Sequence, residues 1–289
     1  MKTRSEPGLR QQAGEGRLVV LIRGGGDLAT GVAARALRAG MAVVITEVAQ
    51  PLAVRRLVAL AEAVYAGEMR VEDLIAQRVE SVETVTEVLR RGGVPVLVDP
   101  AAETRHALRP HVLVDARMRK KPSEIGMEAA RLVIGLGPGL TAGKDCHAVI
   151  ETNRGHHMGR VLWHGQAEAD SGVPEAVSGF DRQRVLRAPA AGVVRGLVPL
   201  GSVVEQGAVV AQVDGAPVTA PFRGALRGLL HDGIRVTVGQ KIGDLDPRAE
   251  QAYCAEISDK ALAVGGGVLE AILRQPDLRR LLGEADAAG

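Results

Sequence analysis

Aromatic residues are scarce in this 289-residue chain, which has one Trp, two Tyr and two Phe. Its core must therefore be built from aliphatic side chains, and apolar residues make up 46% of the sequence. No apolar run reaches the roughly 18 residues of a membrane helix, and the first residues lack the apolar centre of a signal peptide. These absences predict a cytoplasmic protein that makes no membrane contact, with a polar, disordered tail at residues 1–16.

Cysteine and net charge are also limited. The two cysteines, Cys146 and Cys254, form no CxxC pair and no disulfide framework, which is typical of a reducing compartment. The formal charge of +2 is too small to indicate nucleic-acid binding. One basic cluster stands out, and it fits either a solvated loop or a contact with an anion. Its members are Arg117, Arg119, Lys120 and Lys121.

A strand, a glycine-rich turn and a helix open the α/β part of the chain. The run at residues 18–22 is apolar on both faces, as a central parallel strand must be. Gly24, Gly26 and Ala29 follow in a G-x-G-x-x-A spacing. Gly24 lets the chain turn, Gly26 lets backbone N–H groups approach a pyrophosphate, and Ala29 allows close packing of helix on strand. The helix N-terminus adds partial positive charge.

This pattern predicts a nucleotide or NAD(P) site, in which Glu47 accepts hydrogen bonds from ribose at the end of the next strand. Asp27 would repel a phosphate, and it can instead act as a first-turn acid of the helix. The alternative is a glycine turn kept only for packing, with Glu47 merely exposed. The predicted residues of the turn are Gly24, Gly25, Gly26, Asp27, Leu28, Ala29 and Thr30.

Further candidates follow other predicted strands. Asp99 and Asp115 end the runs at residues 94–98 and 112–114, and ligands bind beyond the carboxyl ends of parallel strands. We therefore expect both to converge with Glu47 and Arg117, unless each Asp only forms a turn. A second glycine-rich turn follows the apolar run at residues 132–136 and extends the predicted cofactor-binding set. It contributes Gly137 and Gly139.

Residues 141–164 hold four of the seven His, one Cys and the only Trp. Cys146, with His147 beside it, is a candidate for handling sulfur or selenium, provided that Lys144 or a His lowers its pKa. The alternative is a small buried Cys. A metal site is disfavoured because adjacent Cys and His point to opposite faces of a strand, and none is predicted. The ligand set considered is Cys146, His147, His156 and His157.

The same segment predicts a β-hairpin that pairs residues 146–152 with 160–167. At its tip, Glu151, Arg154 and His156 could bind an anionic ligand or form a solvated polar tip.

The second half contains a tandem repeat, residues 188–214 and 220–246. Each copy is rich in Gly and Val, and a short β unit buries its apolar face against its copy. The pattern resembles the biotinyl/lipoyl-type barrel-sandwich hybrid. The joining hairpin at residues 213–218 has no Lys, so covalent biotin or lipoate is not expected.

We therefore predict an α/β protein: a Rossmann-like parallel sheet domain (17–140) followed by a β-rich domain (141–250) that contains the barrel-sandwich hybrid. A helical segment (251–289) is expected to pack back on the first domain. Three successive glycines (265–267) in its helical pattern indicate that a backbone or ligand approaches closely there.

The stretches RGGGDLATGVA, VIGLGPGLTAGKDCHAVIETNRGHHMGRV and ISDKALAVGGGVLEAIL, in this order, resemble the selenium-dependent molybdenum hydroxylase accessory proteins of the YqeB type. The glycine turn also resembles, at the level of the fold, the Rossmann domain of XdhC-type maturation factors. The resemblance implies an accessory protein that binds a nucleotide or the molybdenum cofactor at residues 24–30. Its partner would be a molybdenum hydroxylase apo-enzyme, with Cys146 handling sulfur or selenium.

Two other functions remain open at this point. One is an NAD(P)-dependent oxidoreductase, and the other is a non-catalytic docking protein that uses the β-rich domain as its contact surface. A homo-oligomer is compatible with either.

Overall fold

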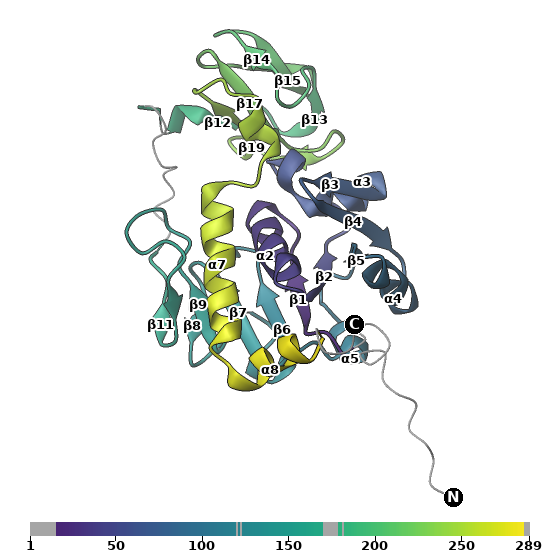
Figure 1. The fold of residues 1–289 in the computed structure, drawn as a ribbon. Coiled ribbons are helices and arrows are strands. Elements are labelled where there is room, and N and C mark those ends of the chain that lie inside the picture. The colour runs from purple at the N-terminus through teal and green to yellow at the C-terminus, as the bar shows by residue number, and fades with distance from the viewer. Residues whose placement is uncertain (1–15, 120, 122, 170–178, 181, 286–289) are drawn as a thin grey trace, which may run out of the picture.

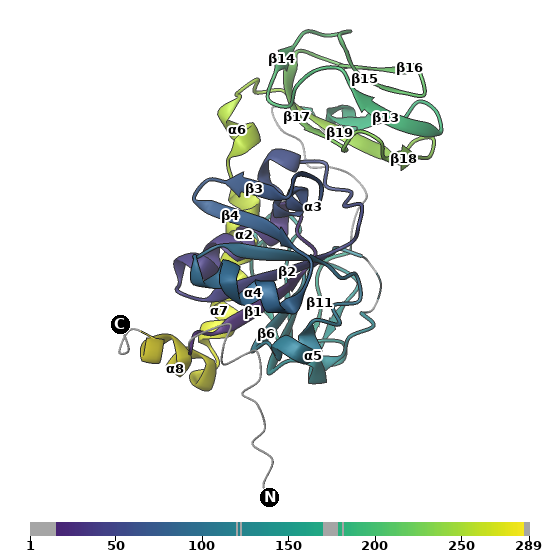
Figure 2. The ribbon, with the colours of Figure 1, turned by 90° about the vertical axis from the view of Figure 1, so that its right-hand side faces the viewer.

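A computed structural model describes residues 16–119, 121, 123–169, 179–180 and 182–285. The predicted tail, apart from its last residue, and Lys120 lie outside these residues. The protein has a mixed α/β architecture, with a large sheet flanked by helices and a smaller all-β module at one end (Figures 1 and 2).

Nine strands form the large sheet in the order β10-β9-β7-β6-β1-β2-β5-β4-β3. The seven strands from β9 to β4 run parallel, and β10 and β3 are antiparallel at the two edges. The strands are β1 (Val19–Arg23), β2 (Ala42–Glu47), β3 (Glu68–Val71), β4 (Leu74–Val79), β5 (Val94–Val98), β6 (Val112–Asp115), β7 (Leu132–Leu136), β9 (Ala148–Ile150) and β10 (Val161–Leu162).

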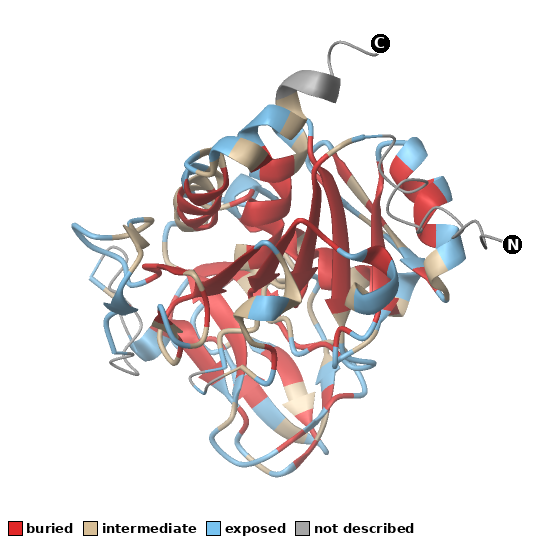
Figure 3. Cartoon of the chain, turned by 90° about the horizontal axis from the view of Figure 1, so that it is seen from below, coloured by how far each residue is buried: buried red, intermediate tan, exposed pale blue. Residues whose placement is uncertain are grey.

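Both faces of this sheet are covered, because its central strands are apolar on both faces. In β1, Val20 and Ile22 belong to one hydrophobic core, and Val19 and Leu21 belong to the other. The central strands are accordingly buried in the view from below (Figure 3). The predicted central parallel strand is confirmed.

Helices α2 (Asp27–Arg38) and α7 (Asp259–Leu273) share the first core, and α4 (Val82–Arg90) and α5 (Arg105–Leu108) share the second. The remaining helices are α3 (Ala63–Ala66), α6 (Ala252–Ala255), α8 (Pro276–Ala285) and the 3-10 turns η1 (Arg56–Val58), η2 (Leu60–Glu62), η3 (Met127–Ala129) and η4 (Arg182–Arg184). None of the described helices combines the length and the apolar character needed to cross a membrane.

Helix α7 comes from the far end of the chain and lies directly against α2 (Figure 1). Glycine makes this approach possible: a Cβ at Gly265 would lie 2.4 Å from the Gly31 carbonyl oxygen, and one at Gly267 would lie 2.2 Å from that of Gly159. The close backbone approach predicted from the three glycines is confirmed at these two positions. Gly266 has open space around its Cβ position.

Residues 185–246, called here the β module, form two four-stranded antiparallel sheets with the orders β12-β19-β17-β14 and β16-β15-β13-β18. The strands are β12 (Val185–Arg187), β13 (Gly192–Gly196), β14 (Val203–Val204), β15 (Val209–Val213), β16 (Ala216–Thr219), β17 (Gly224–Leu229), β18 (Arg235–Val236) and β19 (Lys241–Asp246). A two-stranded ribbon joins β8 (Thr141–Ala142) to β11 (Gly165–Gln166).

The predicted fold class is wrong. In the large sheet β5 lies between β2 and β4, so the strands do not follow the Rossmann order, and the edges are antiparallel. The structure does not show a biotinyl/lipoyl barrel-sandwich hybrid in the β module. The two copies of the repeat do not close on themselves, because each gives its two-residue strand to a sheet of the other: β14 pairs with β17, and β18 pairs with β13.

The predicted domain boundary at residue 140 also needs correction. Strands β9 and β10 lie beyond it and still belong to the large sheet. They pair as an antiparallel hairpin, with Val161 opposite Ile150, which confirms the predicted hairpin. The pairing of β9 with β7 and of β10 with β9 carries the large sheet on to Leu162.

Candidate functional site

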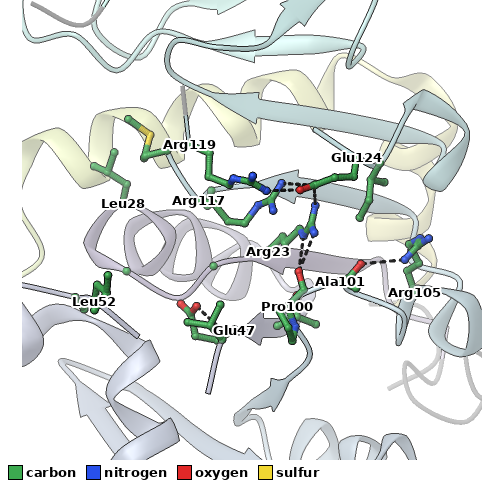
Figure 4. A pocket seen from close by; sticks show the side chains of 18 of the residues that line it. Arg23, Leu28, Glu47, Leu52, Pro100, Ala101, Arg105, Arg117, Arg119 and Glu124 are labelled. Carbon is green, nitrogen blue, oxygen red and sulfur yellow. Dashed lines mark hydrogen bonds and ion pairs between the residues drawn. The ribbon is translucent and has the colours of Figure 1, made fainter. Parts of the chain in front are cut away.

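A cavity of about 930 Å³ lies where β1, β2 and β6 end. Ligands of open α/β sheets bind beyond the carboxyl ends of the strands, so this is the expected place for a site. Its wall comes from the glycine turn, the loops after β2 and β5, and the loop after β6 (Figure 4). The lining residues include Arg23, Gly24, Gly26, Asp27, Leu28, Glu47, Val48, Leu52, Pro100, Ala101, Glu103, Arg105, Arg117, Met118, Arg119, Glu124 and Ile125.

The glycine turn has the geometry that its spacing predicts. Gly24 has a φ of 96°, in the left-handed region that favours glycine. A Cβ at Gly25 would lie 2.9 Å from the backbone nitrogen of Ala61, whereas Gly26 has open space on that side. Ala29 is buried where α2 packs on the sheet. Gly26 therefore leaves the start of α2 open to the cavity.

The first N–H groups of α2 are available to a ligand. Over the residues that the structure describes, no hydrogen-bond acceptor pairs with the N–H groups of Gly26, Asp27 or Leu28, and no side chain caps the helix. Such groups are partly positive and bind anions. Thr30 is turned away from the cavity, since its hydroxyl donates to the Gly26 carbonyl oxygen and accepts from the Leu60 N–H.

Glu47 lines the cavity and braces the glycine turn. Its Oε2 accepts from the Gly25 N–H at 2.8 Å, and its Oε1 accepts from the Val48 N–H at 2.7 Å. The Gly25 N–H is therefore taken by a carboxylate, and it does not belong to the free set at the start of α2.

Asp27, the acid that argued against phosphate binding, is paired. Its Oδ2 lies 2.6 Å from the Arg55 Nη1, and the two side chains are 26% and 12% exposed. The guanidinium offsets the negative charge next to the cavity. Oδ1 of Asp27 is buried and has no hydrogen-bond partner among the described residues.

The opposite wall carries an arginine cluster, made of Arg23, Arg117 and Arg119 around the carboxylate of Glu124. Arg23 and Arg117 donate to Oε2 at 2.9 and 3.1 Å, and Arg119 donates to Oε1. A hydrogen bond from its own backbone N–H, together with these guanidinium groups, holds the pKa of Glu124 far below its usual range, and outweighs burial, which acts in the opposite direction.

Asp115 stands behind this cluster instead of lining the cavity. It is 6% exposed and accepts from Arg117 at 2.9 and 2.6 Å, which orients that guanidinium. Asp99, the other predicted strand-end acid, accepts from the backbone N–H groups of Glu103 and Thr104, so it shapes the loop after β5. The structure thus brings Glu47 and Arg117 to one cavity and gives both Asp residues supporting positions.

The remaining predicted cofactor-binding residues lie elsewhere. Gly137 and Gly139 form the turn after β7, both at positive φ, and a Cβ at Gly137 would meet Thr152 and Met118. Neither glycine lines the cavity.

Cys146 has an environment opposite to the one its predicted role required. It is 1% exposed, and burial raises the pKa of its thiol to about 11. A reactive thiol needs a lowered pKa and access to solvent. Nδ1 of His147 accepts from the Val133 N–H at 2.9 Å, so this ring nitrogen is used by the backbone of β7. The prediction that these two residues handle sulfur or selenium is not supported by this geometry.

The hairpin tip is occupied by internal contacts. Glu151 accepts from the N–H groups of Asn153 and Glu168, and Arg154 binds both oxygens of Asp259 at the start of α7. The rings of His156 and His157 meet edge to face. Among the described residues, no group of three or more His, Cys, Asp or Glu side chains is placed to hold a metal ion.

Sequence reasoning missed several residues of the cavity. Arg23 precedes Gly24 directly, so its place at a strand end could have been noticed. Glu124 lies in a loop with no recognisable motif, and only the folded chain brings it to Arg23. Leu52 follows β2 in a stretch without a recognised motif, and it is 58% exposed in the cavity wall.

A curated protein resembles this chain over most of its length. The chain is 48% identical over 258 residues to the "Uncharacterized protein YqeB" of Escherichia coli K12, which agrees with the YqeB-type resemblance. The match covers 89% of this chain and 48% of that protein, so the chain spans about half the length of this relative. No family model matches the chain.

Among solved structures, an aspartoacylase family protein from Mesorhizobium loti matches with a TM-score of 0.27 and 11% identity. The match covers 79% of this chain and 85% of the aspartoacylase family protein.

Proposed function

We propose that the protein binds a nucleotide, or the phosphate-bearing molybdenum cofactor, in the cavity at the start of α2. The observation that carries this proposal is the opening of an uncapped helix N-terminus into a cavity of about 930 Å³. Within the described part of the chain, the N–H groups of Gly26, Asp27 and Leu28 have no acceptor. A phosphoryl group is the ligand that such N–H groups suit best.

The rest of the cavity suits the other parts of such a ligand. Glu47 offers carboxylate oxygens that can also accept from ribose hydroxyls. Val48 and Leu52, 40% and 58% exposed, give an apolar surface on which a planar base or pterin ring can lie, and Met118 adds to the apolar lining. Ligand sites commonly combine apolar walls with a few polar groups in this way.

We further propose that this binding serves the maturation of a molybdenum hydroxylase. Support comes from the resemblance of the motifs to the YqeB-type accessory proteins, whose association is with selenium-dependent molybdenum hydroxylases. The partner in this proposal is the hydroxylase apo-enzyme, and the cavity ligand is the molybdenum cofactor or a nucleotide that accompanies its handling.

The test of ligand binding compares two variants of one residue. Leu28→Glu puts a carboxylate beside the free N–H groups, and Leu28→Gln is its neutral match. Thermal shift is measured with AMP, ATP, NAD, NADP and molybdopterin, since a ligand at 100 times its Kd stabilises by about 2.7 kcal/mol. We expect at least one ligand to stabilise the wild type and Leu28→Gln, and to lose this effect with Leu28→Glu. If no ligand stabilises the wild type, the proposal fails.

The maturation role needs its own measurement. Molybdenum content and activity of a hydroxylase are compared after expression with the wild type or with Leu28→Glu. We expect the variant to lower both. Equal values would separate cofactor binding from maturation and contradict the second part of the proposal.

A further inference from the structure

The arginine cluster on the cavity wall combines two largely buried cations, Arg23 and Arg117, and one exposed cation, Arg119, with an exposed anion. Arg23 is 4% exposed, and the Arg117 side chain is 15% exposed. Glu124, on which both converge together with Arg119, has a side chain that is 55% exposed. Figure 4 shows the three guanidinium groups pointing at this one carboxylate. The carboxylate thus sits on the solvent side of the guanidinium groups, where a ligand would enter.

The charges of this cluster favour a doubly charged ligand. Asp115 holds Arg117 through two hydrogen bonds and lies 3.9 Å from Arg23, so one of the three positive charges is matched from behind. Glu124 matches a second. Without Glu124 the cluster would carry a net charge of +2, the opposite of a phosphate monoester dianion.

We propose that this cluster is a phosphate subsite that Glu124 occupies in the unliganded protein, and that a terminal phosphate of the cavity ligand displaces the Glu124 carboxylate. This proposal rests on the proposed function, since it concerns the same cavity. It adds that the ligand carries a phosphate monoester, in addition to the groups bound at the start of α2. A ligand carboxylate would only exchange one negative charge for another. A phosphate dianion brings two charges and further acceptor oxygens to guanidinium groups that are already oriented.

The experiment measures binding of inorganic phosphate by calorimetry at low ionic strength. Wild type is compared with Glu124→Gln, which removes the competing charge and keeps the side-chain size. Glu87→Gln serves as the matched control, because Glu87 of α4 pairs with Arg91, the residue after that helix, and is similarly exposed. We expect phosphate to bind about tenfold more tightly to Glu124→Gln than to the wild type, and Glu87→Gln to behave like the wild type.

Two additions locate the effect. In the double variant Glu124→Gln with Arg119→Gln, we expect the gain in phosphate affinity to be lost, because one of the three guanidinium charges is removed. Arg119 is the exposed member of the cluster, so its replacement should leave the fold intact. Glu124→Gln should raise the affinity for acetate, a singly charged carboxylate, much less than the affinity for phosphate. An equal gain for acetate would overturn the assignment to a dianion.

The outcomes separate this inference from the proposed function. If nucleotides and molybdopterin stabilise the protein but Glu124→Gln leaves phosphate affinity unchanged or weaker, the subsite is wrong and the cavity remains a ligand site. If Glu124→Gln raises the affinity for phosphate but none of the larger ligands bind, the subsite stands and the proposed function fails. If phosphate binds neither protein, the inference is overturned.

Discussion

Gly265 of α7 touches Gly31 of α2 so closely that a Cβ at Gly265 would lie 2.4 Å from the Gly31 carbonyl oxygen. One residue further along the same helix, the Cβ position of Gly266 is open. Gly265 therefore has no room for a larger side chain, whereas Gly266 does. Both lie inside a helix, where Gly is less favourable than Ala by helix propensity.

The first prediction concerns this contact. Gly265→Ala forces the two backbones apart, and we expect it to lower the free energy of unfolding by about 1–3 kcal/mol, as overpacking does. Gly266→Ala should be neutral or raise it by up to about 1 kcal/mol, because Ala is the better helix former. Chemical denaturation of both variants checks this. A similar loss in both would mean that α7 does not lie on α2 in this register.

The second prediction concerns Asp27. Asp27→Asn removes a negative charge next to the free N–H groups of α2, so phosphate-bearing ligands should bind more tightly, by about three- to tenfold. The same change leaves Arg55 without its carboxylate partner, so thermal stability should fall. Calorimetry and thermal melting measure the two effects. Weaker binding by the variant would show that Asp27 contacts the ligand favourably.

The third prediction concerns the thiols. Cys146 and Cys254 are both about 1% exposed, and burial raises the pKa of each. With a pKa of about 11, the Cys146 thiol is only ~0.1% ionised at pH 8. We expect a thiol reagent at pH 8 to label neither cysteine in the folded protein within minutes, and both in denaturant. Rapid labelling of Cys146 in the folded protein would restore it as a candidate nucleophile.

The fourth prediction concerns acid stability. Hydrogen bonds from Arg154 lower the pKa of Asp259 to about 2, from the usual 3.8 of an aspartate. A carboxyl whose pKa is lowered by folding stabilises the folded state at every pH above its pKa in the unfolded chain. This contribution disappears as the pH falls towards 2. Asp259→Asn should therefore lower the melting temperature at pH 6, with the difference from wild type shrinking between pH 4 and pH 2. A pH-independent difference would contradict the ion pair.

Much of the local structure could be predicted from the sequence. The strand before Gly24, the turn itself and the β9–β10 hairpin all follow from residues near one another in the chain. The three glycines at 265–267 indicated a close approach but not its partner, Gly31. Sequence reasoning failed where partners are distant. The repeat predicted two copies packed against each other, and it could not show that the short strands β14 and β18 pair with the other copy.

The candidate site divides in the same way. The glycine turn and Glu47 were predicted because their role depends on spacing within one β-α-β unit. The place of Glu124 was not, because its hydrogen bond to Arg23 joins residues 101 positions apart. For Cys146 the sequence left a reactive and a buried thiol both open, and burial in the fold, which is not visible from its neighbours in sequence, raises its pKa.

By itself the sequence determined where strands, turns and helices form, because hydrophobic periodicity and glycine act over a few residues. Tertiary structure alone decided the strand order, the exchange of strands within the β module and the meeting of the arginine cluster with Glu124. Those features depend on which distant surfaces bury one another and on which charges then remain next to the cavity.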